Sequence, residues 1–521
     1  MRPRPRPDPA AAIVQPGRNA SREATAGTAG VIVDAADYFH AVYWAAERAQ
    51  RSLLLSGWEF DSALPLLRGD DRPPGAEVRL VRFLDGLCER NPNLYICILA
   101  WNFHVVLAAE REWLQRMYFH WLTHEHLHFV LEDSPVSGGS MHQKFAVIDG
   151  RIAFLGGMGL REACWDDRRH LAENPDRLTR GRPDKPYHDV QAYLAGGEAP
   201  MAVEQYFFQR WQRAGGTLPP LPPPVPGGDD YRPLGALVLG GGPVALSRTQ
   251  PHTTGLIVRD VERLFAGAIA AAEQLIFIET QYFSSRTVRD ALVRRMREPP
   301  RSKLDIVVVN ERGEAVKEDI AVGLRQLENV VELRRVAGET GHAFGVYDSL
   351  PDGAGDDASR PTYIHSKLMV VDDRFLTVGS ANVTNRSMGV DCELHASWEA
   401  TPRDAALHRR IRRVRVSLLA EHSGVSGAHA VRGLLPAEGL VARLDAMAAV
   451  SGARFRRHRP PSPAQRAMLA VVEPESLPFD SDGRDHAALM DPTDERGPQT
   501  VLARAVASLW SALTGSRRRA A

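Results

Sequence analysis

The sequence predicts an α/β fold built from two similar subdomains, each a mixed sheet flanked by helices. Three observations lead to this prediction. Helical and strand-like segments alternate, the alternation starts again after a proline-rich break, and one arrangement of histidine, lysine and aspartate occurs once on each side of the break. Alternating strands and helices are typical of sheets whose faces are covered by helices.

The first half opens with apolar residues at helical spacing, followed by a short apolar run that is typical of a buried strand. A second helix and a second strand continue the pattern, and the other half repeats it. Helix, strand, helix and strand are predicted at 36–50, 52–58, 78–90 and 94–101, and again at 261–272, 274–279, 287–297 and 304–310. The repetition indicates an internal duplication.

Changes in composition divide the chain into five segments. Residues 1–28 are rich in Pro, Ala, Arg and Gly, and we expect them to be disordered. The stretch GGTLPPLPPPVP and the following GGDD cannot continue a helix or a central strand, so residues 215–232 are predicted to be a linker. This linker separates an N-terminal half at 29–214 from a C-terminal half at 233–420. Residues 421–521 form a C-terminal tail whose structure the sequence does not indicate.

Charge and cysteine content exclude some classes of protein. The 64 Lys and Arg residues balance 64 Asp and Glu residues, whereas domains that hold nucleic acid usually carry a basic excess. The four cysteines form no CxxC pair, so neither a zinc knuckle nor a disulfide framework is indicated, and we expect reduced thiols in a cytosolic protein. No apolar run is long enough to cross a bilayer, and the apolar stretch Ala10–Val14 is too short for the core of a signal peptide.

The arrangement that occurs twice lies in MHQKFAVIDGRIAFLGGMGL at 141–160 and in IHSKLMVVDDRFLTVGSANV at 364–383. Both copies contain a histidine, a lysine two residues later, an aspartate seven residues later and a glycine fourteen residues later: His142, Lys144, Asp149 and Gly156, and then His365, Lys367, Asp372 and Gly379. Residues two apart in a strand point to the same face, so each histidine and its lysine project together. A single HxK would carry little weight, but two complete copies indicate function.

The duplicated pattern HxKx4Dx6G, followed by Ser or Gly, resembles that of the phospholipase D superfamily. Four further segments are similar to passages of its phospholipase members: CWDDRRH at 164–170, PYHDVQAYLAG at 186–196, IETQYF at 278–283 and NVTNRSMGVDCE at 382–393. The resemblance extends over roughly residues 30–420. It implies an active site at the pseudo-twofold interface between the halves, so that neither half alone is catalytic.

Two histidine–lysine pairs suit the cleavage of a phosphodiester. One imidazole can attack phosphorus to form a phosphohistidine, while the other protonates the departing alcohol. The lysines can hold the phosphate as point charges, so the chemistry requires no metal or other cofactor. The resemblance implies that His142 is the nucleophile and His365 the general acid, which then deprotonates water or a second alcohol.

Two acids are implied to orient these histidines. By resemblance, Glu393 hydrogen-bonds His142 and Asp189 hydrogen-bonds His365, so that each half orients the histidine of the other. Asp149 and Asp372 complete the catalytic motif, although their position beyond an apolar run favours hydrogen bonding at a turn and a strand end.

The phosphate is expected to contact both motif lysines and the residues after the motif glycines. Ser380 and Asn382 follow the second motif, and the Asn382 amide can donate to a phosphate oxygen. The first copy departs from the family pattern, because Gly159 stands where Asn or Asp is common and offers only its backbone donor. We expect the presence of Gly159 at this position to affect the choice of substrate or the rate of the reaction.

The preferred function is phospholipase D: hydrolysis of phosphatidylcholine or a related glycerophospholipid to phosphatidic acid and a free head group, with transphosphatidylation when an alcohol competes with water. The alternatives are a cardiolipin-synthase-like phosphatidyltransferase, a nuclease of the same superfamily and an inactive lipid-binding protein. We expect a cytoplasmic monomer that meets its phospholipid at the inner face of the membrane and binds no nucleic acid.

Overall fold

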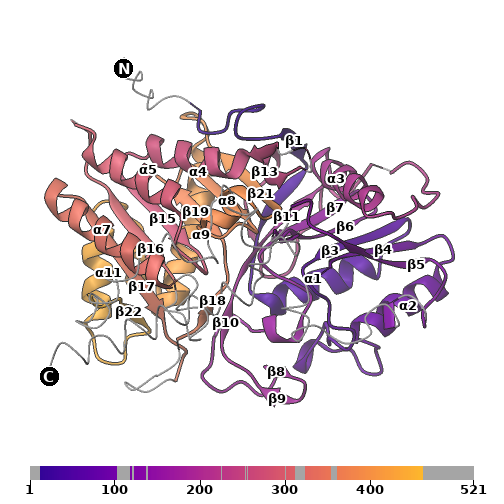
Figure 1. Cartoon of the computed structure of the whole chain (residues 1–521). Coiled ribbons are helices and arrows are strands. Elements are labelled where there is room, and N and C mark those ends of the chain that lie inside the picture. Colours follow the sequence, from indigo (N-terminus) through magenta and orange to yellow (C-terminus); the bar gives the residue numbers. More distant parts are fainter. Residues whose placement is uncertain are drawn as a thin grey trace, which may run out of the picture.

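The computed structural model describes the greater part of the chain as two α/β lobes that lie side by side (Figure 1). The indigo-to-magenta lobe is the N-terminal half and the pink-to-yellow lobe is the C-terminal half. The described residues are 12–102, 118–119, 122–136, 139–224, 226–252, 254, 256–299, 301–310, 323–353 and 361–460.

The N-terminal lobe is an eight-stranded sheet in the order β12-β2-β11-β7-β6-β3-β4-β5. Its strands are β2 (Thr28–Val33), β3 (Ser52–Gly57), β4 (Tyr95–Trp101), β5 (Leu127–Glu132), β6 (Lys144–Ile148), β7 (Ile152–Gly156), β11 (Val190–Ala195) and β12 (Leu237–Val238). Strands β3, β4 and β5 are parallel and the other pairings are antiparallel. Helices α1 (Ala35–Ala46) and α2 (Leu80–Arg90) cover one face, and α3 (Ala199–Arg213) covers the other.

The C-terminal lobe is a ten-stranded sheet in the order β1-β13-β21-β20-β19-β15-β16-β17-β22, with β14 paired to β13. Its strands are β1 (Arg22–Ala26), β13 (Gly242–Pro251), β14 (Ile257–Arg259), β15 (Leu275–Glu279), β16 (Asp305–Val309), β17 (Ala343–Ser349), β19 (Leu368–Val371), β20 (Phe375–Gly379), β21 (Glu393–Glu399) and β22 (Phe455–Arg457). The helices are α4 (Asp260–Ala271), α5 (Arg286–Arg297), α7 (Leu324–Thr340), α8 (Asn385–Gly389), α9 (Ala405–Ser423), α10 (Ala428–Arg432) and α11 (Leu440–Ala448).

Short elements complete the fold. They are the 3₁₀ turns η1 (Gly69–Asp71) and η4 (Glu162–Cys164), a hairpin of β8 (Leu178–Thr179) and β9 (Arg182–Pro183), and a pair formed by β10 (Tyr187–His188) and β18 (Tyr363–Ile364). Among the helices in the described ranges, none combines the length and the apolar character that a bilayer crossing requires.

The predicted fold class and all eight predicted elements are present. The predicted helices correspond to α1, α2, α4 and α5, and the predicted strands to β3, β4, β15 and β16. The two strand orders match position by position, with β2, β11, β7, β6, β3, β4 and β5 answering to β13, β21, β20, β19, β15, β16 and β17. One apolar core continues through both lobes, because inward-facing residues of both sheets meet α3 and α9 in a single cluster.

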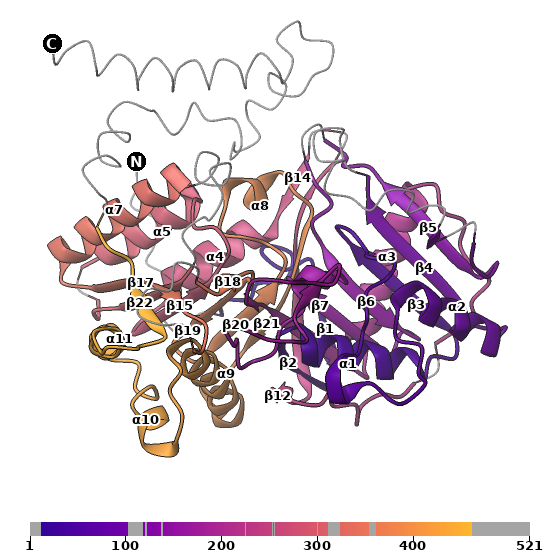
Figure 2. The ribbon, with the colours of Figure 1, turned by 90° about the horizontal axis from the view of Figure 1, so that it is seen from below.

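The two halves exchange edge strands. Strand β1, from before the first half, pairs with β13 of the second (Figure 1). Strand β12, from after the linker, pairs with β2 of the first (Figure 2). The prediction that residues 1–28 are disordered is therefore wrong for the described part of that segment. Its composition is poor in large apolar residues, but the existing sheet edge supplies backbone hydrogen-bond partners, and Ala24 and Ala26 are buried there. Residues 1–11 lie outside the described residues.

The predicted boundary at residue 420 falls inside α9 and is also corrected. Beyond it, α11 packs on β16 and β17, and β22 adds an antiparallel edge strand to β17. The C-terminal lobe therefore continues to about residue 457, and the rest of the predicted tail, from 461 onward, lies outside the described residues. Within the predicted linker, residues 215–224 and 226–232 contain no helix or strand.

Candidate active site

The two HxK motifs lie at equivalent ends of β6 and β19, where the lobes meet. The histidine side chains are the accessible members of the motifs, with 13% of His142 and 14% of His365 exposed. The lysines are more deeply buried, at 6% for Lys144 and 1% for Lys367. The two imidazoles are thus the partly exposed groups of the site, and the two lysine side chains are buried.

Each histidine is held by an acid from the other lobe. His142 Nδ1 lies 3.0 Å from Glu393 Oε2, and His365 Nδ1 lies 2.7 Å from Asp189 Oδ2. Both hydrogen bonds expected from the sequence are therefore present. Because Nδ1 is occupied in each ring, Nε2 is the nitrogen that remains for chemistry.

Backbone pairing between the lobes fixes these positions. The His365 N–H donates to the carbonyl of His188 at 2.8 Å, next to Asp189, as part of the parallel pair β10 and β18. The His142 N–H donates to the carbonyl of Cys392 at 3.0 Å, next to Glu393. Each motif is thus joined through its main chain to the segment that carries its orienting acid.

Burial and mutual repulsion disfavour positive charge in the site. Burial lowers the pKa of Lys144 to about 8, and burial together with the charge of Lys144 lowers that of Lys367 to about 7. Burial and the neighbouring lysines also lower the pKa of His142 and take that of His365 well below its usual value. An anion placed among these four groups would relieve the repulsion, so the arrangement suits a phosphate group.

The two orienting acids differ in charge. Burial would raise the pKa of Glu393, but His142, Lys144 and a hydrogen bond from Ser380 outweigh it and lower this pKa to about 2. Burial raises the pKa of Asp189 to about 7, against the opposing charge of Lys367. The His142 side therefore carries a fixed carboxylate, and the His365 side holds an acid that titrates near neutrality.

Comparison with known proteins agrees with this duplicated geometry. A family model described as "Cardiolipin synthase, PLD-like domain" matches residues 266–414, which contain the second motif and Glu393. The first motif and Asp189 repeat the same arrangement in the other lobe. The chain is similar to the phospholipase D superfamily.

Named relatives within the superfamily include phospholipase D alpha 1 of Carica papaya, which is 23% identical over 476 residues, covering 67% of this chain and 58% of that protein. Phospholipase D alpha 3 of Arabidopsis thaliana is 23% identical, covering 66% and 57%, and phospholipase D A of Dictyostelium discoideum is 26% identical, covering 68% and 31%. The chain thus spans less than two thirds of the length of these curated relatives. Among solved structures, a phosphatidylserine synthase of Haemophilus influenzae superposes with a TM-score of 0.48 at 13% identity, covering 75% of this chain and 88% of that one.

The aspartates of the duplicated motif lie away from the histidines and lysines. Asp149 accepts backbone N–H groups of residues 50–52, and Asp372 accepts those of residues 273–275. Each lies at the far end of its strand, about 16 Å along the chain from its lysine. Their grouping with the catalytic residues is therefore corrected. They join the turn after β6 or β19 to the start of β3 or β15.

The sequence predicts that Ser380 contacts the phosphate, and in the structure its hydroxyl is hydrogen-bonded within the protein. The hydroxyl donates to Glu393 Oε2 at 2.5 Å and accepts the N–H of Leu394 at 3.1 Å. It therefore supports the orienting acid. The equivalent residue in the first motif is Gly157, where a side chain would collide with Asp189.

The positions after the motif glycines remain unequal. The Asn382 amide lies 3.4 Å from Gln281 Oε1, which is also 3.4 Å from Lys367 Nζ. Gly159 occupies the equivalent position in the first lobe, and a Cβ there would meet nothing closer than Arg161 Cγ at 3.8 Å. The position that carries the Asn382 amide in the second lobe therefore has no side chain in the first lobe, and the surrounding atoms leave room for one.

Sequence reasoning missed Trp58, whose indole meets the His142 ring edge-on at 5.3 Å between centroids. Lys144 Nζ lies 5.7 Å from the centre of the same indole, whereas Lys367 Nζ contacts Gln281. The strand registers make Trp58 the counterpart of Gln281, since β3 pairs with β6 as β15 pairs with β19. Alignment of the two halves through their strands would have found it.

Proposed function

We propose that the protein is a phospholipase D, which hydrolyses phosphatidylcholine or a related glycerophospholipid to phosphatidic acid and the free head-group alcohol. The observation that carries this proposal is the crossed pairing of His142 with Glu393 and of His365 with Asp189, above two buried lysines. The similarity to relatives named phospholipase D alpha supports a phospholipid substrate.

In the first step, His142 Nε2 attacks phosphorus. This nitrogen carries a lone pair because the lowered pKa of His142 keeps the ring neutral, with its proton on Nδ1 toward Glu393. The ionised carboxylate stabilises the positive charge that develops on the ring as the P–N bond forms. Lys144 and Lys367 stabilise the nonbridging oxygens of the phosphate.

His365 supplies the proton for the departing alcohol. In the free site its pKa lies well below the usual value because of burial and the charges of Lys367 and Lys144. A bound phosphodiester carries one negative charge that offsets the lysines, so substrate binding raises the pKa of His365 and favours the protonated ring. Asp189 then hydrogen-bonds an imidazolium, which is the charge state that its carboxylate stabilises.

The second step reverses these roles. After the head group has left, neutral His365 takes a proton from water, whose oxygen attacks phosphorus as the P–N bond to His142 breaks. A primary alcohol at the same position would give a phosphatidylalcohol. Hydrolysis and transphosphatidylation thus share one phosphohistidine intermediate.

The test is incubation of the full chain with phosphatidylcholine vesicles, EDTA and a primary alcohol, followed by measurement of choline and phosphatidylalcohol, with DNA in a parallel reaction. His142→Ala should abolish the covalent intermediate, and His365→Ala should slow its breakdown. His429→Ala is the matched control, since His429 is exposed on α10. DNA cleavage without choline release would contradict the proposal, as would unchanged turnover in either motif variant.

The second candidate is a phosphatidyltransferase that uses a phospholipid alcohol as acceptor, which the match to a cardiolipin synthase domain at 266–414 favours. The same assay with phosphatidylglycerol as donor and acceptor separates the two. Cardiolipin formation that exceeds hydrolysis would favour the transferase. The monomeric state and the location at the inner face of the membrane stay predictions.

A further inference from the structure

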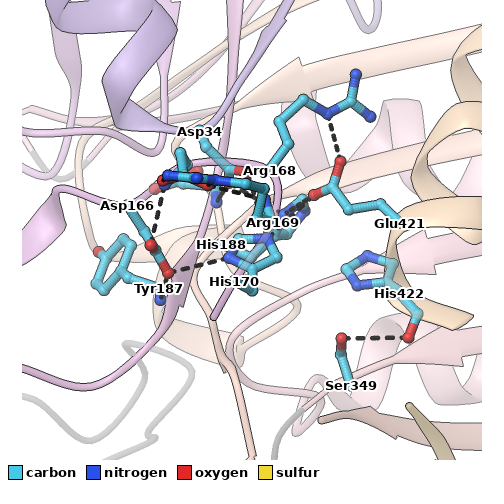
Figure 3. Close-up of polar contacts among 12 residues, drawn as sticks. Asp34, Asp166, Arg168, Arg169, His170, Tyr187, His188, Ser349, Glu421 and His422 are labelled. Atoms are coloured by element: carbon cyan, nitrogen blue, oxygen red, sulfur yellow. Dashed lines mark hydrogen bonds and ion pairs between the residues drawn. The ribbon is translucent and has the colours of Figure 1, made fainter. Parts of the chain in front are cut away.

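Behind the active site lies a second group of ionisable side chains that the phosphodiester chemistry does not use (Figure 3). It consists of Asp34, His170, His188 and Glu421, each with one ligand atom within 4.8 Å of those of the others. Asp34, His170 and His188 come from the N-terminal lobe, and Glu421 from α9 of the C-terminal lobe. All four side chains are almost completely buried.

The nitrogen and oxygen atoms are spaced like the ligands of a metal ion. His170 Nε2 lies 3.3 Å from Asp34 Oδ2 and 3.1 Å from Glu421 Oε1. His188 Nδ1 lies 3.1 Å from Asp34 Oδ1 and 2.9 Å from Glu421 Oε1. Ligands at about 2.0–2.1 Å from a tetrahedral Zn²⁺ are about 3.3–3.4 Å apart, so only small shifts separate this group from a coordination shell.

Two of these atoms lack hydrogen bonds although they are buried. Asp34 Oδ2 and His188 Nδ1 have no hydrogen-bond partner, even though His170 Nε2 lies 3.3 Å from Asp34 Oδ2, and Asp34 Oδ1 and Glu421 Oε1 lie 3.1 and 2.9 Å from His188 Nδ1. A buried polar atom without a hydrogen bond is costly, and native structures rarely contain one without a reason. Close approach with poor hydrogen-bond geometry is the arrangement expected of atoms that face a common ion.

The outer nitrogens of both histidines are already held by acids. His170 Nδ1 lies 3.0 Å from Asp166 Oδ2, and His188 Nε2 lies 3.0 Å from Glu279 Oε2. A carboxylate that accepts the outer N–H of a metal-binding histidine fixes its tautomer and makes it a better ligand. The other nitrogen of each ring, Nε2 of His170 and Nδ1 of His188, therefore faces Asp34 and Glu421, and His170 Nε2 also makes a 3.1 Å hydrogen bond to Glu421 Oε1.

The charges do not balance unless two positive charges are added. The carboxylates Asp34, Asp166, Glu279 and Glu421 bring four negative charges. Among the described residues, the arginines paired with them are Arg168 with Glu421 at 2.5 Å and Arg177 with Asp166 at 3.0 Å. With neutral histidines the group is two positive charges short. One divalent cation would remove this deficit, and so would protons on His170 and His188, whose pKa values the surrounding carboxylates raise against the effect of burial.

We propose that Asp34, His170, His188 and Glu421 bind one divalent transition-metal ion, with Zn²⁺ in four-coordinate N₂O₂ geometry as the best match. Four protein ligands leave no open position, which is the mark of a structural site. A neighbouring set, His188, Glu279 and His422, is less suitable, because it offers three side chains rather than four, and both of its histidines are hydrogen-bonded to Glu279, at 3.0 and 2.9 Å.

The ion would affect catalysis only by holding Asp189 and His365 in position. Asp34 Oδ1 accepts the N–H of Asp189 at 3.1 Å, and the carbonyl of the ligand His188 accepts the N–H of His365 at 2.8 Å. A metal that joins these ligands to Glu421 therefore clamps the two lobes directly behind the His365–Asp189 pair. The lysines, and not the metal ion, bind the phosphate. The metal site therefore does not depend on which phosphodiester the active site cleaves.

The test is the metal content of the full chain, purified from a medium that contains zinc and analysed by mass spectrometry. We expect about one metal ion per chain. Exchange for Co²⁺ should give the visible absorption of tetrahedral cobalt. His170→Gln and Glu421→Gln should each lower bound metal at least about tenfold. His395→Gln is the matched control, a buried histidine outside the group, and should keep the metal.

Two further measurements cover variants that fail to fold and separate this proposal from the lipase reaction. Asp166→Asn keeps all four ligands and should weaken Zn²⁺ binding about 10–100-fold in a competition assay. His142→Ala should lose hydrolysis but keep its metal. If the wild-type chain binds no stoichiometric metal, and neither Zn²⁺ nor Co²⁺ raises the Tm of chelator-treated protein, the proposal is wrong and protons carry the missing charge.

Discussion

Replacement of Gly157 by alanine should separate Asp189 from His365. A Cβ at this position would lie 2.3 Å from Asp189 Oδ1 and 2.7 Å from Oδ2, whereas ordinary contacts begin at 3.4 Å. The carboxylate must therefore move by about 1.1 Å, the difference between 3.4 and 2.3 Å. The Asp189 main chain cannot follow, because its N–H and carbonyl are both bonded to Asp34. The side chain has to rotate, and its 2.7 Å hydrogen bond to His365 is lost.

A displacement of about 1 Å at a catalytic group typically costs about 10²-fold in rate, which corresponds to about 2.7 kcal/mol of transition-state stabilisation. Overpacking should also lower the free energy of unfolding by about 1–3 kcal/mol. Choline release from a short-chain phosphatidylcholine measures the first effect and thermal unfolding the second.

Gly159→Ala is the matched control for Gly157→Ala. It lies two residues away, neither glycine has a left-handed backbone, and its new methyl group would be 3.8 Å from the nearest side-chain atom. Wild-type kcat/KM in Gly157→Ala would refute the positioning argument. An equal loss in both variants would show that the loop, rather than the Asp189 carboxylate, is responsible.

Three further predictions address stability and substrate binding. Asp149→Asn and Asp372→Asn should each lower the free energy of unfolding by about 1–3 kcal/mol, because an amide cannot replace a carboxylate that accepts several backbone N–H groups. Chemical denaturation should show this loss while turnover per folded molecule stays unchanged. Burial lowers the pKa of His395 to about 4, below that of the unfolded chain, so its contribution to stability is complete above about pH 6.5 and is lost as the pH falls through 4. That loss is about 3 kcal/mol, and denaturation between pH 7 and 4 should show a flatter profile for His395→Gln. Gly159→Asn should restore the amide present at Asn382 and lower KM for phosphatidylcholine, and an unchanged KM would show that this position does not contact the phosphate.

Repetition in the sequence was sufficient to predict most of the fold. The helices and strands recur at matching positions in the two halves, and the motif spacing places each histidine and lysine at a strand end. The pairing of Glu393 with His142 came from family resemblance rather than from local pattern. No periodicity links residues that are 251 positions apart.

The remaining features depend on tertiary contacts that local sequence does not encode. Strand β1 is a short alanine-containing segment that is ordered by the edge of β13, and the Ser380 hydroxyl donates to a glutamate thirteen residues away. The group of Asp34, His170, His188 and Glu421 is assembled from residues that lie far apart in the sequence. The fold of the N-terminal lobe brings Asp34, His170 and His188 together, and the contact between the lobes adds Glu421 from α9.

The exchange of β1 and β12 has a consequence for synthesis of the chain. Ala24 pairs with Val244, so β1 leaves the ribosome 220 residues before its partner. At about 5–20 residues per second, this interval is about 11–44 s. Over the same interval the N-terminal sheet lacks β12, which emerges only at Leu237–Val238. Neither half of the sequence can therefore complete its own sheet. If the gene were divided at the linker, the N-terminal product would lack β12 and carry an unpaired β1, and the C-terminal product would lack β1 and carry an unpaired β12.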